Sequence, residues 1–285
     1  AVMPMINMLD TAIVLRRLQA TGYTYEQANS LYGQLQGMAS TMVNLPQVVT
    51  IALAMSIVPA VSDAAARDDW VAVREDSASA FRVSLMLGLP ASAGLVVLAG
   101  PIMRMLFPAE PASLGQVMFI MGFAVLFLTQ LQTLTGILQG LGRPDIPVRN
   151  LMTGALFKLI LTYTLTATAL HVRGAAIGTV TAYLVAFSLN LKEVKAMTGL
   201  RLNRKQMILK PLLCAGVMAA LAWTLHRVLE PATGNTLAVL AAVLAGALVY
   251  GLMLLKTNTL ETRDFDLLPR GQKIAALLRR VRLMK

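Results

Sequence analysis

Long uncharged hydrophobic runs, separated by short polar segments, dominate the pattern of the chain. The run at residues 34–62 contains no charged side chain. At a helical rise of about 1.5 Å per residue, it is longer than the roughly 30 Å hydrocarbon core of a bilayer. Seven further runs have the same character, and the eight predicted spans are residues 1–15, 34–62, 83–103, 112–141, 151–170, 174–191, 211–225 and 237–255. The pattern therefore predicts an all-α polytopic membrane protein with about eight transmembrane helices.

The longest of these uncharged stretches also holds residues that a simple membrane anchor does not need. Asn44 and Gln47 lie within the second span together with Pro46 and Pro59, and Pro90 lies in the span that follows. A proline inside a helix removes a backbone hydrogen bond and kinks the helix. Membrane helices tolerate this where neighbouring groups or cavity water satisfy the freed carbonyl. We therefore expect bent helices beside a polar cavity, with Asn44 and Gln47 either lining that cavity or joining helices by hydrogen bonds.

The composition excludes an ordinary soluble domain. The chain is 56% hydrophobic and 14% charged, whereas a soluble domain has about 25% charged residues. The net charge of +11 does not indicate a nucleic-acid surface, because most of the 25 basic residues fall in alternate connections and in the tail. Cytoplasmic loops of membrane proteins have this bias. The charge pattern therefore predicts that both ends of the chain are cytoplasmic.

The two ends of the chain have distinct characters. The sequence starts with Ala1 inside a hydrophobic run, without a basic segment followed by a cleavage site, so we expect a fragment of a longer protein. The tail at residues 256–285 is basic, and apolar residues recur on one helical face near its end. It is either an amphipathic helix lying on anionic lipids or a solvated basic segment. The single cysteine, Cys214, excludes a disulfide framework.

Ionisable residues inside the spans are the main functional candidates, because they are costly in hydrocarbon. Lys158 lies about 12 Å from the cytoplasmic end of its predicted span, and Asp10 about 9 Å from the opposite surface. These depths differ by about 9 Å in a core of about 30 Å, so a direct salt bridge requires Lys158 to reach outward, and we do not assume one. Lys158 either lines a cavity or extends to the inner headgroups. Asp10 either lines the same cavity or pairs locally with Arg16 or Arg17.

The sequence contains no pattern that points to an enzyme. Metal-ligand spacings, a glycine-rich phosphate loop and a nucleophile elbow are all absent from it. We therefore expect no cofactor. An ion gradient (H⁺ or Na⁺) or the membrane potential remains a possible driving force, since no nucleotide site is visible.

Three segments carry a family resemblance. The stretch GQLQGMASTMVNLPQVVTIALAMSIVPAVSDAAARDD, at residues 33–69, resembles bacterial polysaccharide-biosynthesis and stage V sporulation protein B membrane proteins. ILQGLGRPDIPVRNLMTGALFK (137–158) and GAAIGTVTAYLVAFSLNL (174–191) resemble the same family in the same order and spacing. The family lies in the multidrug/oligosaccharidyl-lipid/polysaccharide flippase superfamily, which includes MurJ-like lipid II flippases.

The resemblance implies a fourteen-helix transporter with two six-helix lobes and two trailing helices. This chain then supplies helices seven to fourteen: residues 1–195 as the C-terminal lobe, 196–255 as the trailing pair and 256–285 as the tail. The N-terminal lobe, absent from this sequence, is the implied structural partner. The residues expected on the cavity side of the C-terminal lobe are Asp10, Arg16, Arg17, Asn44, Gln47 and Lys158.

The function implied is the flipping of a lipid-linked oligosaccharide, with lipid II as the leading substrate, across the bacterial cytoplasmic membrane by alternating access. The substrate diphosphate is expected to pair with Arg16, Arg17 or Lys158, and the polyprenyl chain to stay in lipid along the trailing helices. Anionic lipids are expected at the tail, and nucleic acid is not an expected partner. Two alternatives remain: a cation-coupled multidrug antiporter with Asp10 at its cation site, and a non-transporting scaffold for cell-envelope synthesis.

Overall fold

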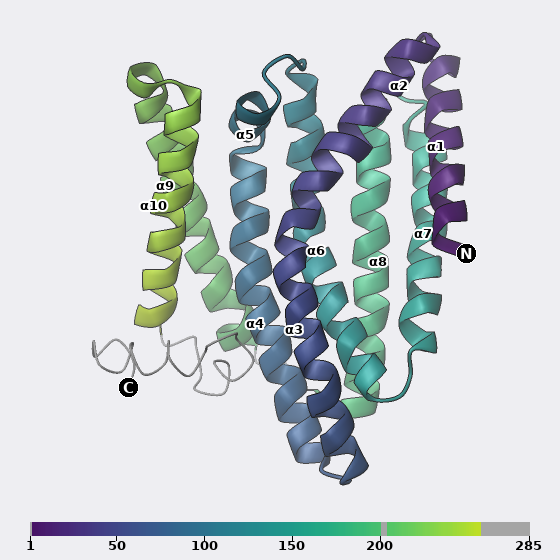
Figure 1. Ribbon diagram of the computed structural model, residues 1–285, viewed down its shortest axis with the longest axis vertical. Helices are drawn as coiled ribbons and strands as arrows, with labels where there is room; N and C mark the ends of the chain where they lie inside the picture. Colours follow the sequence, from purple (N-terminus) through teal and green to yellow (C-terminus); the bar gives the residue numbers. More distant parts are fainter. Residues whose placement is uncertain (1, 201–203, 258–285) are drawn as a thin grey trace.

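The computed structural model describes residues 2–200 and 204–257, and every element in them is a helix (Figure 1). The elements are α1 (Val2–Ala20), α2 (Tyr25–Gly33), η1 (Gln34–Ala39), α3 (Ser40–Ala66), α4 (Trp70–Val97), α5 (Ala99–Leu106), α6 (Ser113–Gly140), α7 (Asp145–Leu165), α8 (Val172–Thr198), η2 (Arg204–Leu209), α9 (Lys210–Thr233) and α10 (Asn235–Lys256). The predicted all-α fold is confirmed for this part of the chain. The predicted amphipathic tail lies outside the described residues.

Six helical segments of the described chain are long and apolar enough to cross a membrane. They are Tyr25–Ala66, Trp70–Val97, Ser113–Gly140, Val172–Thr198, Met207–Thr233 and Asn235–Lys256. Of the eight predicted spans, helix length and composition therefore support six. The other two predicted spans correspond to α1 and α7, which carry Asp10, Arg17 and Lys158 and are correspondingly less apolar.

Several helix ends differ from the ends of the hydrophobic runs. The predicted polar connection after α1 is largely the helix α2, which starts with a capping box in which Thr24 and Gln27 exchange hydrogen bonds. The predicted charged loop at residues 63–82 is mostly helical, since α3 ends at Ala66 and α4 begins at Trp70. The predicted span at 83–103 divides at Leu98 between α4 and α5. Hydropathy marks the membrane-embedded part of a helix, whereas hydrogen bonding and capping set its ends.

The bundle is organised around α6, which packs against α3, α4, α5 and α8. Helix α7 lies along α8, and α1 lies against α7 at one edge (Figure 1). Helices α9 and α10 form a hairpin at the opposite edge and pack mainly on α4. The upper end of the bundle in Figure 1 contains the α1–α2, α5–α6, α7–α8 and α9–α10 connections, and the lower end the α3–α4 and α6–α7 connections. These lower connections belong to the side that the loop charges predict to be cytoplasmic.

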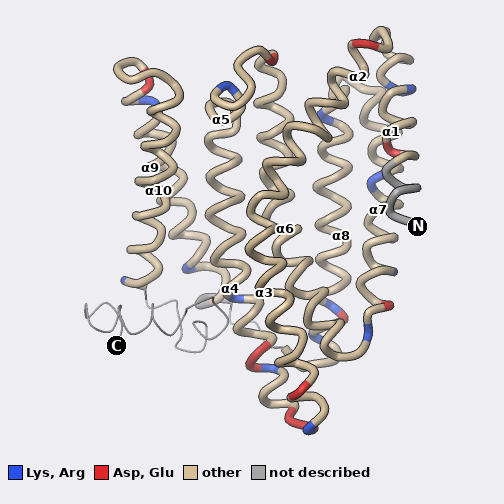
Figure 2. Tube along the Cα trace, in the orientation of Figure 1, with Lys and Arg blue, Asp and Glu red and all other residues tan. Residues whose placement is uncertain are grey.

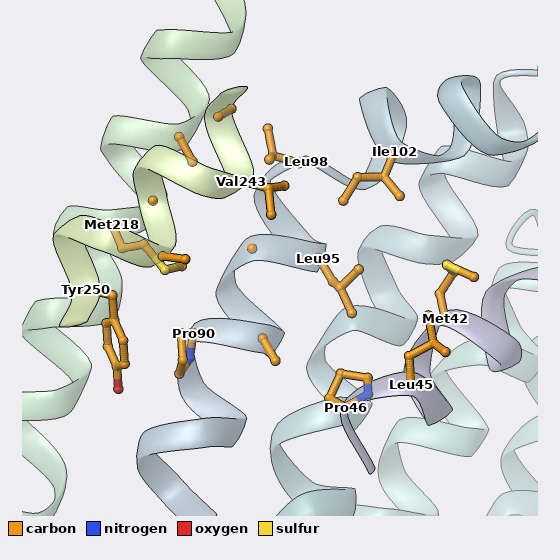
Figure 3. Close-up of a pocket in the computed structure, with 16 residues that line it drawn as sticks. Met42, Leu45, Pro46, Pro90, Leu95, Leu98, Ile102, Met218, Val243 and Tyr250 are labelled. Atoms are coloured by element: carbon orange, nitrogen blue, oxygen red, sulfur yellow. The ribbon is translucent and has the colours of Figure 1, made fainter. Parts of the chain in front are cut away.

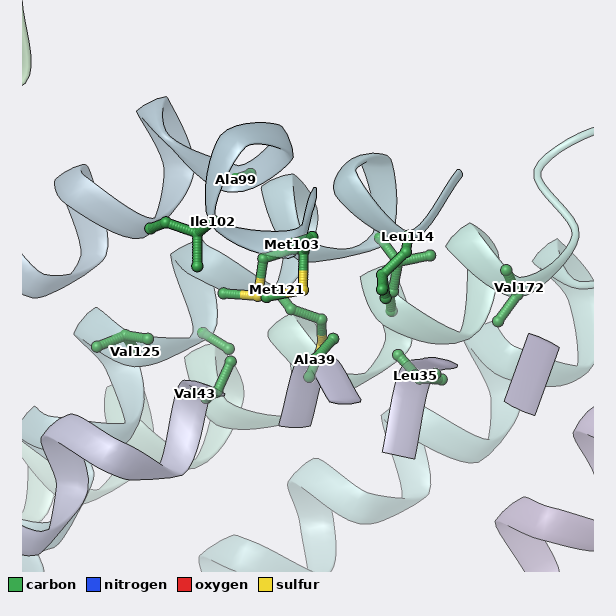
Figure 4. Packing of buried hydrophobic residues seen from close by; sticks show 14 of the residues in the cluster. Leu35, Ala39, Val43, Ala99, Ile102, Met103, Leu114, Met121, Val125 and Val172 are labelled. Atoms are coloured by element: carbon green, nitrogen blue, oxygen red, sulfur yellow. The ribbon is translucent and has the colours of Figure 1, made fainter. Parts of the chain in front are cut away.

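Close packing of small and apolar residues holds the bundle together. A Cβ atom placed on Gly136 of α6 would lie only 2.9 Å from the carbonyl oxygen of Ala54 on α3, so the glycine lets the two backbones approach. In the upper half, Leu35, Met103 and Met121 bring η1, α5 and α6 together in one buried cluster (Figure 4). Inside a bilayer such contacts act through van der Waals attraction rather than through removal of surface from water.

Charged side chains gather toward the two ends of the bundle (Figure 2). The clear exception lies between α1 and α7, where an acidic and a basic residue face each other part-way along the helices. This exception is the starting point for the functional site.

Candidate functional site

Asp10 and Lys158 form an ion pair between α1 and α7. The Nζ atom of Lys158 lies 2.8 Å from Oδ2 of Asp10, and the two side chains are 13% and 0% exposed respectively. This pair was not assumed from the sequence, because the ends of the hydrophobic runs, taken as helix ends, put the two residues at different depths. Helix α1 continues to Ala20, which places Asp10 about 15 Å from its upper end, and Lys158 lies about 10 Å from the upper end of α7. The length of the lysine side chain covers the difference.

The surroundings of this pair hold further polar atoms. Neither carboxylate oxygen of Asp10 accepts a hydrogen bond of standard geometry from the described residues, so the nearby ammonium provides the charge compensation. The hydroxyl groups of Thr162 on α7 and of Thr166 just after its end are also buried without a hydrogen-bond partner in the described part of the chain. Breaking one side of such a pair leaves a buried charge uncompensated, which makes the pair a strong link between α1 and α7.

The two arginines of α1 have different roles. The Nε atom of Arg17 donates to the backbone oxygen of Tyr163 at 3.0 Å, and its guanidinium lies 4.2 Å from the centre of the Tyr163 ring. This cation–π contact is a second link between α1 and α7. Arg16 is exposed near the upper end of α1. Of the basic residues predicted to meet a diphosphate, Arg17 and Lys158 are therefore engaged within the protein, and Arg16 is exposed.

In the described part of the chain, the groove that Pro46 and Pro90 line is apolar. Asn44 is exposed and Gln47 half-buried on α3, whereas Pro46 faces an apolar groove together with Pro90 of α4. The polar and proline positions point in different directions because each residue turns the helix by about 100°. Pro59 is exposed toward the lower end of α3.

The groove has a volume of about 400 Å³ and lies between the lobe and the hairpin α9–α10 (Figure 3). Side chains from α3, α4, α5, α9 and α10 line it, among them Leu45, Pro46, Pro90, Leu95, Met218 and Val243. Nearly all of its surface is apolar. A site of this character suits a hydrocarbon chain and offers almost nothing to hold a charged headgroup.

Pro90 also explains how the hairpin is attached. Because proline has no backbone N–H, the carbonyl of Met86, four residues earlier, loses its helical partner. The hydroxyl of Tyr250 on α10 donates to that carbonyl oxygen at 2.9 Å. The predicted kink at Pro90 thus has its freed carbonyl satisfied by a neighbouring helix. Sequence reasoning did not identify Tyr250, because no local signal links a tyrosine to a proline kink so far away along the chain.

Other buried polar contacts were also not predicted. In the lower half, the Nδ2 atom of Asn150 donates to Oδ1 of Asn190 at 2.8 Å, joining α7 to α8. Arg82, which hydropathy assigned to a loop, is only 6% exposed within α4. No cluster of three or more histidine, cysteine, aspartate or glutamate side chains suited to a metal ion occurs in the described residues.

Comparisons with known proteins agree with this arrangement. The family model described as lipid II flippase MurJ matches residues 37–247. The chain is 27% identical over 282 residues to the uncharacterised membrane protein YabM of Bacillus subtilis, covering 96% of this chain and 52% of YabM. It is 28% identical over 200 residues to stage V sporulation protein B of the same organism, covering 69% of this chain and 38% of that protein.

A solved structure shares the fold. The lipid II flippase MurJ in an inward closed conformation superposes with a TM-score of 0.67 at 18% identity, over 87% of this chain and 50% of the solved chain. The chain therefore spans about half the length of YabM and of the solved transporter. The predicted family resemblance is confirmed, and the protein is a multi-pass membrane protein.

Proposed function

Because the chain belongs to the MurJ family of lipid II flippases, we propose that it forms one lobe and the trailing helix pair of a transporter that flips a lipid-linked oligosaccharide. The complete transporter has a second lobe, since this chain spans about half the length of YabM and of the solved flippase. Its lower end faces the cytoplasm, in accord with the excess of basic residues in the connections there. The substrate proposed is lipid II, by analogy with the family.

The apolar groove is the observation that carries this proposal. A polyprenyl chain is a long hydrocarbon, and the groove offers about 400 Å³ of apolar space at the boundary between lobe and trailing pair. Pro46 of α3 and Pro90 of α4 both line the groove, and a proline inside a helix favours a kink there. The chain of the lipid rests in this groove while its headgroup crosses between the lobes.

The headgroup requires positive charge in the space between the lobes. Arg16 is the residue of this chain best placed to pair with a diphosphate, because its guanidinium is exposed and arginine binds phosphate in a bidentate manner. Lys158 and Arg17 hold α1 against α7 and support that surface indirectly. The driving force is an ion gradient or the membrane potential.

Reconstitution provides the direct test. The full-length protein is placed in liposomes with fluorescent lipid II, and movement between leaflets is followed by quenching of the dye from outside. We expect flipping well above that of protein-free vesicles. A rate equal to that of protein-free vesicles for lipid II and for other polyprenyl-linked oligosaccharides would contradict the proposal.

The ion pair weighs against the antiporter alternative. A cation-coupled multidrug antiporter needs a carboxylate that can exchange its cation, and Asp10 was the sequence candidate. In the structure its charge is already compensated by the ammonium of Lys158 at 2.8 Å. A scaffold that does not transport needs neither the apolar groove nor the polar contacts between α1 and α7.

A further inference from the structure

Besides the packing of α9 on α4 and of α10 on α5, polar contacts join the hairpin α9–α10 to the rest of the bundle at two levels, with the apolar groove between them. One level is the hydrogen bond from Tyr250 to the Met86 carbonyl, near the middle of α4. The other is at the upper end, where α10 begins at Asn235. Fifteen residues separate Asn235 from Tyr250, which corresponds to about 22 Å along α10.

A small polar network makes the upper contact. The Nδ2 atom of Asn235 donates to the backbone oxygen of Pro101 on α5 at 3.0 Å. Because that amide group donates to α5, Oδ1 of Asn235 is left to accept from Nε2 of His226 at 3.1 Å. Arg104 of α5 lies 3.0 Å from Glu230 of α9, and this ion pair is 57% and 35% exposed. An exposed ion pair contributes only about 0–1 kcal/mol, so it adds little to the buried packing of Val239 and Ala242 in the cluster that includes Ile102 of α5.

The contact at the level of Tyr250 is of a different kind. Tyr250 is 6% exposed, and its hydroxyl satisfies a carbonyl that Pro90 leaves without a helical partner. Separating the two in the membrane interior would leave both groups without a partner, at a cost greater than that of opening the upper contact. The hydrogen bond of Tyr250 is therefore the costlier of the two polar contacts to break.

The two helices of the hairpin pack closely on each other. Helices α9 and α10 pack along their length, and a Cβ atom on Gly246 would already lie 3.3 Å from Cγ of Met218. The turn between them is Gly234 alone, with a φ of 79° that favours glycine. Gly246 and Ala247 of α10 also line the groove, and their small size leaves space there.

We propose that the hairpin α9–α10 is a hinged gate for the apolar groove, pivoting where Tyr250 holds the Met86 carbonyl and fastened at its upper end by a latch of Asn235, Arg104 and Glu230. Opening the latch widens the groove toward the lipid without detaching the hairpin. The purpose of this motion, to admit and release a lipid chain, rests on the proposed function, whereas the motion itself does not.

Distance measurements between spin labels test the gate in the full-length protein in lipid nanodiscs. Cys214 is replaced by alanine, and a first label pair is placed at the exposed positions Leu237 and Leu106, at the upper ends of α10 and α5. A second pair is placed at the exposed positions Leu252 and Val71, toward the lower ends of α10 and α4. The upper pair reports the latch and the lower pair reports whether the hairpin stays attached.

The decisive variant is Asn235→Asp. It keeps the size of the side chain and an oxygen for His226, but an ionised aspartate cannot donate to the Pro101 carbonyl. We expect the upper pair to gain a second population at longer distance, and the lower pair to keep its distribution. Arg104→Gln should have the same effect in weaker form. The matched control is Thr236→Ala, the exposed neighbour of Asn235, which should leave both pairs unchanged.

Two results would overturn the inference. An upper-pair distribution that is unchanged in both Asn235→Asp and Arg104→Gln would show that no latch exists there. Equal shifts of both pairs would show that the hairpin detaches as a whole and has no hinge at Tyr250. Because neither distance depends on transport, a protein that does not flip lipid II could still show the gate, and a failed gate would leave the flippase proposal standing.

Discussion

At the scale of single residues, the pair of Asp10 and Lys158 shows how buried charge is compensated in this bundle. Sequence reasoning selected both residues because ionisable side chains in hydrocarbon are costly. It did not assume that they pair, because the depth of each depends on where its helix ends. Helix α1 continues to Ala20, past its hydrophobic run, and α7 ends at Leu165, before the end of its run. The structure brings Nζ and Oδ2 to 2.8 Å.

Removing one member of this pair should destabilise the protein strongly. We expect Lys158→Met to cost about 3–5 kcal/mol, because Asp10 would remain as a buried charge without compensation. Adding Asp10→Leu should recover most of the loss, since both charges are then gone. Thermal unfolding in detergent measures the effect, with Arg16→Met as the control at an exposed position. If Lys158→Met alone is as stable as the unmodified protein, the pair does not hold α1 to α7.

At the scale of helices, prolines and glycines decide how closely the elements meet. The kink at Pro90 was predicted from sequence, but the group that satisfies the freed carbonyl was not, because Tyr250 is 164 residues away from Met86. Likewise the sequence marks Gly136 only as a small residue. Its packing against the backbone of α3 is visible only in the fold.

The contact between α3 and α6 gives a prediction at this scale. Gly136→Leu should destabilise the protein by about 1–3 kcal/mol or more, because the side chain has no room beside the Ala54 carbonyl and the two helices must separate. Gly216→Leu on α9 is the matched control, since nothing lies within 4 Å of a Cβ at that exposed glycine. The midpoint of thermal unfolding should be lower for Gly136→Leu than for Gly216→Leu. Equal midpoints for the two variants would be evidence that α3 and α6 do not depend on this close approach.

At the scale of the whole molecule, the arrangement of lobe and hairpin creates the groove. Two groups of helices that are distant in sequence, α3 to α5 and α9 with α10, contribute its walls, and the small residues of α10 keep it open. This is the feature on which the proposed function depends most.

Filling the groove should slow transport. Ala247→Trp places an indole ring inside the apolar space, so a lipid chain can no longer occupy it, and we expect a drop of about tenfold or more in lipid II flipping, equivalent to about 1.4 kcal/mol. Leu248→Trp is the control, because this neighbouring side chain is 69% exposed on the other side of α10. Both variants are measured in the liposome assay. Equal rates for the two would exclude the groove as the path of the lipid chain.

The sequence by itself determined the class of fold, the membrane setting, the family and the positions of the costly residues. These follow from hydropathy, helix length and local motifs, which act over a few turns of chain. Only the tertiary structure decided which polar groups meet and where space remains. The Asp10–Lys158 pair, the Tyr250–Met86 hydrogen bond and the apolar groove all depend on the relative shift and rotation of helices far apart in sequence. Packing across the whole bundle sets that register, and no local stretch of sequence contains it.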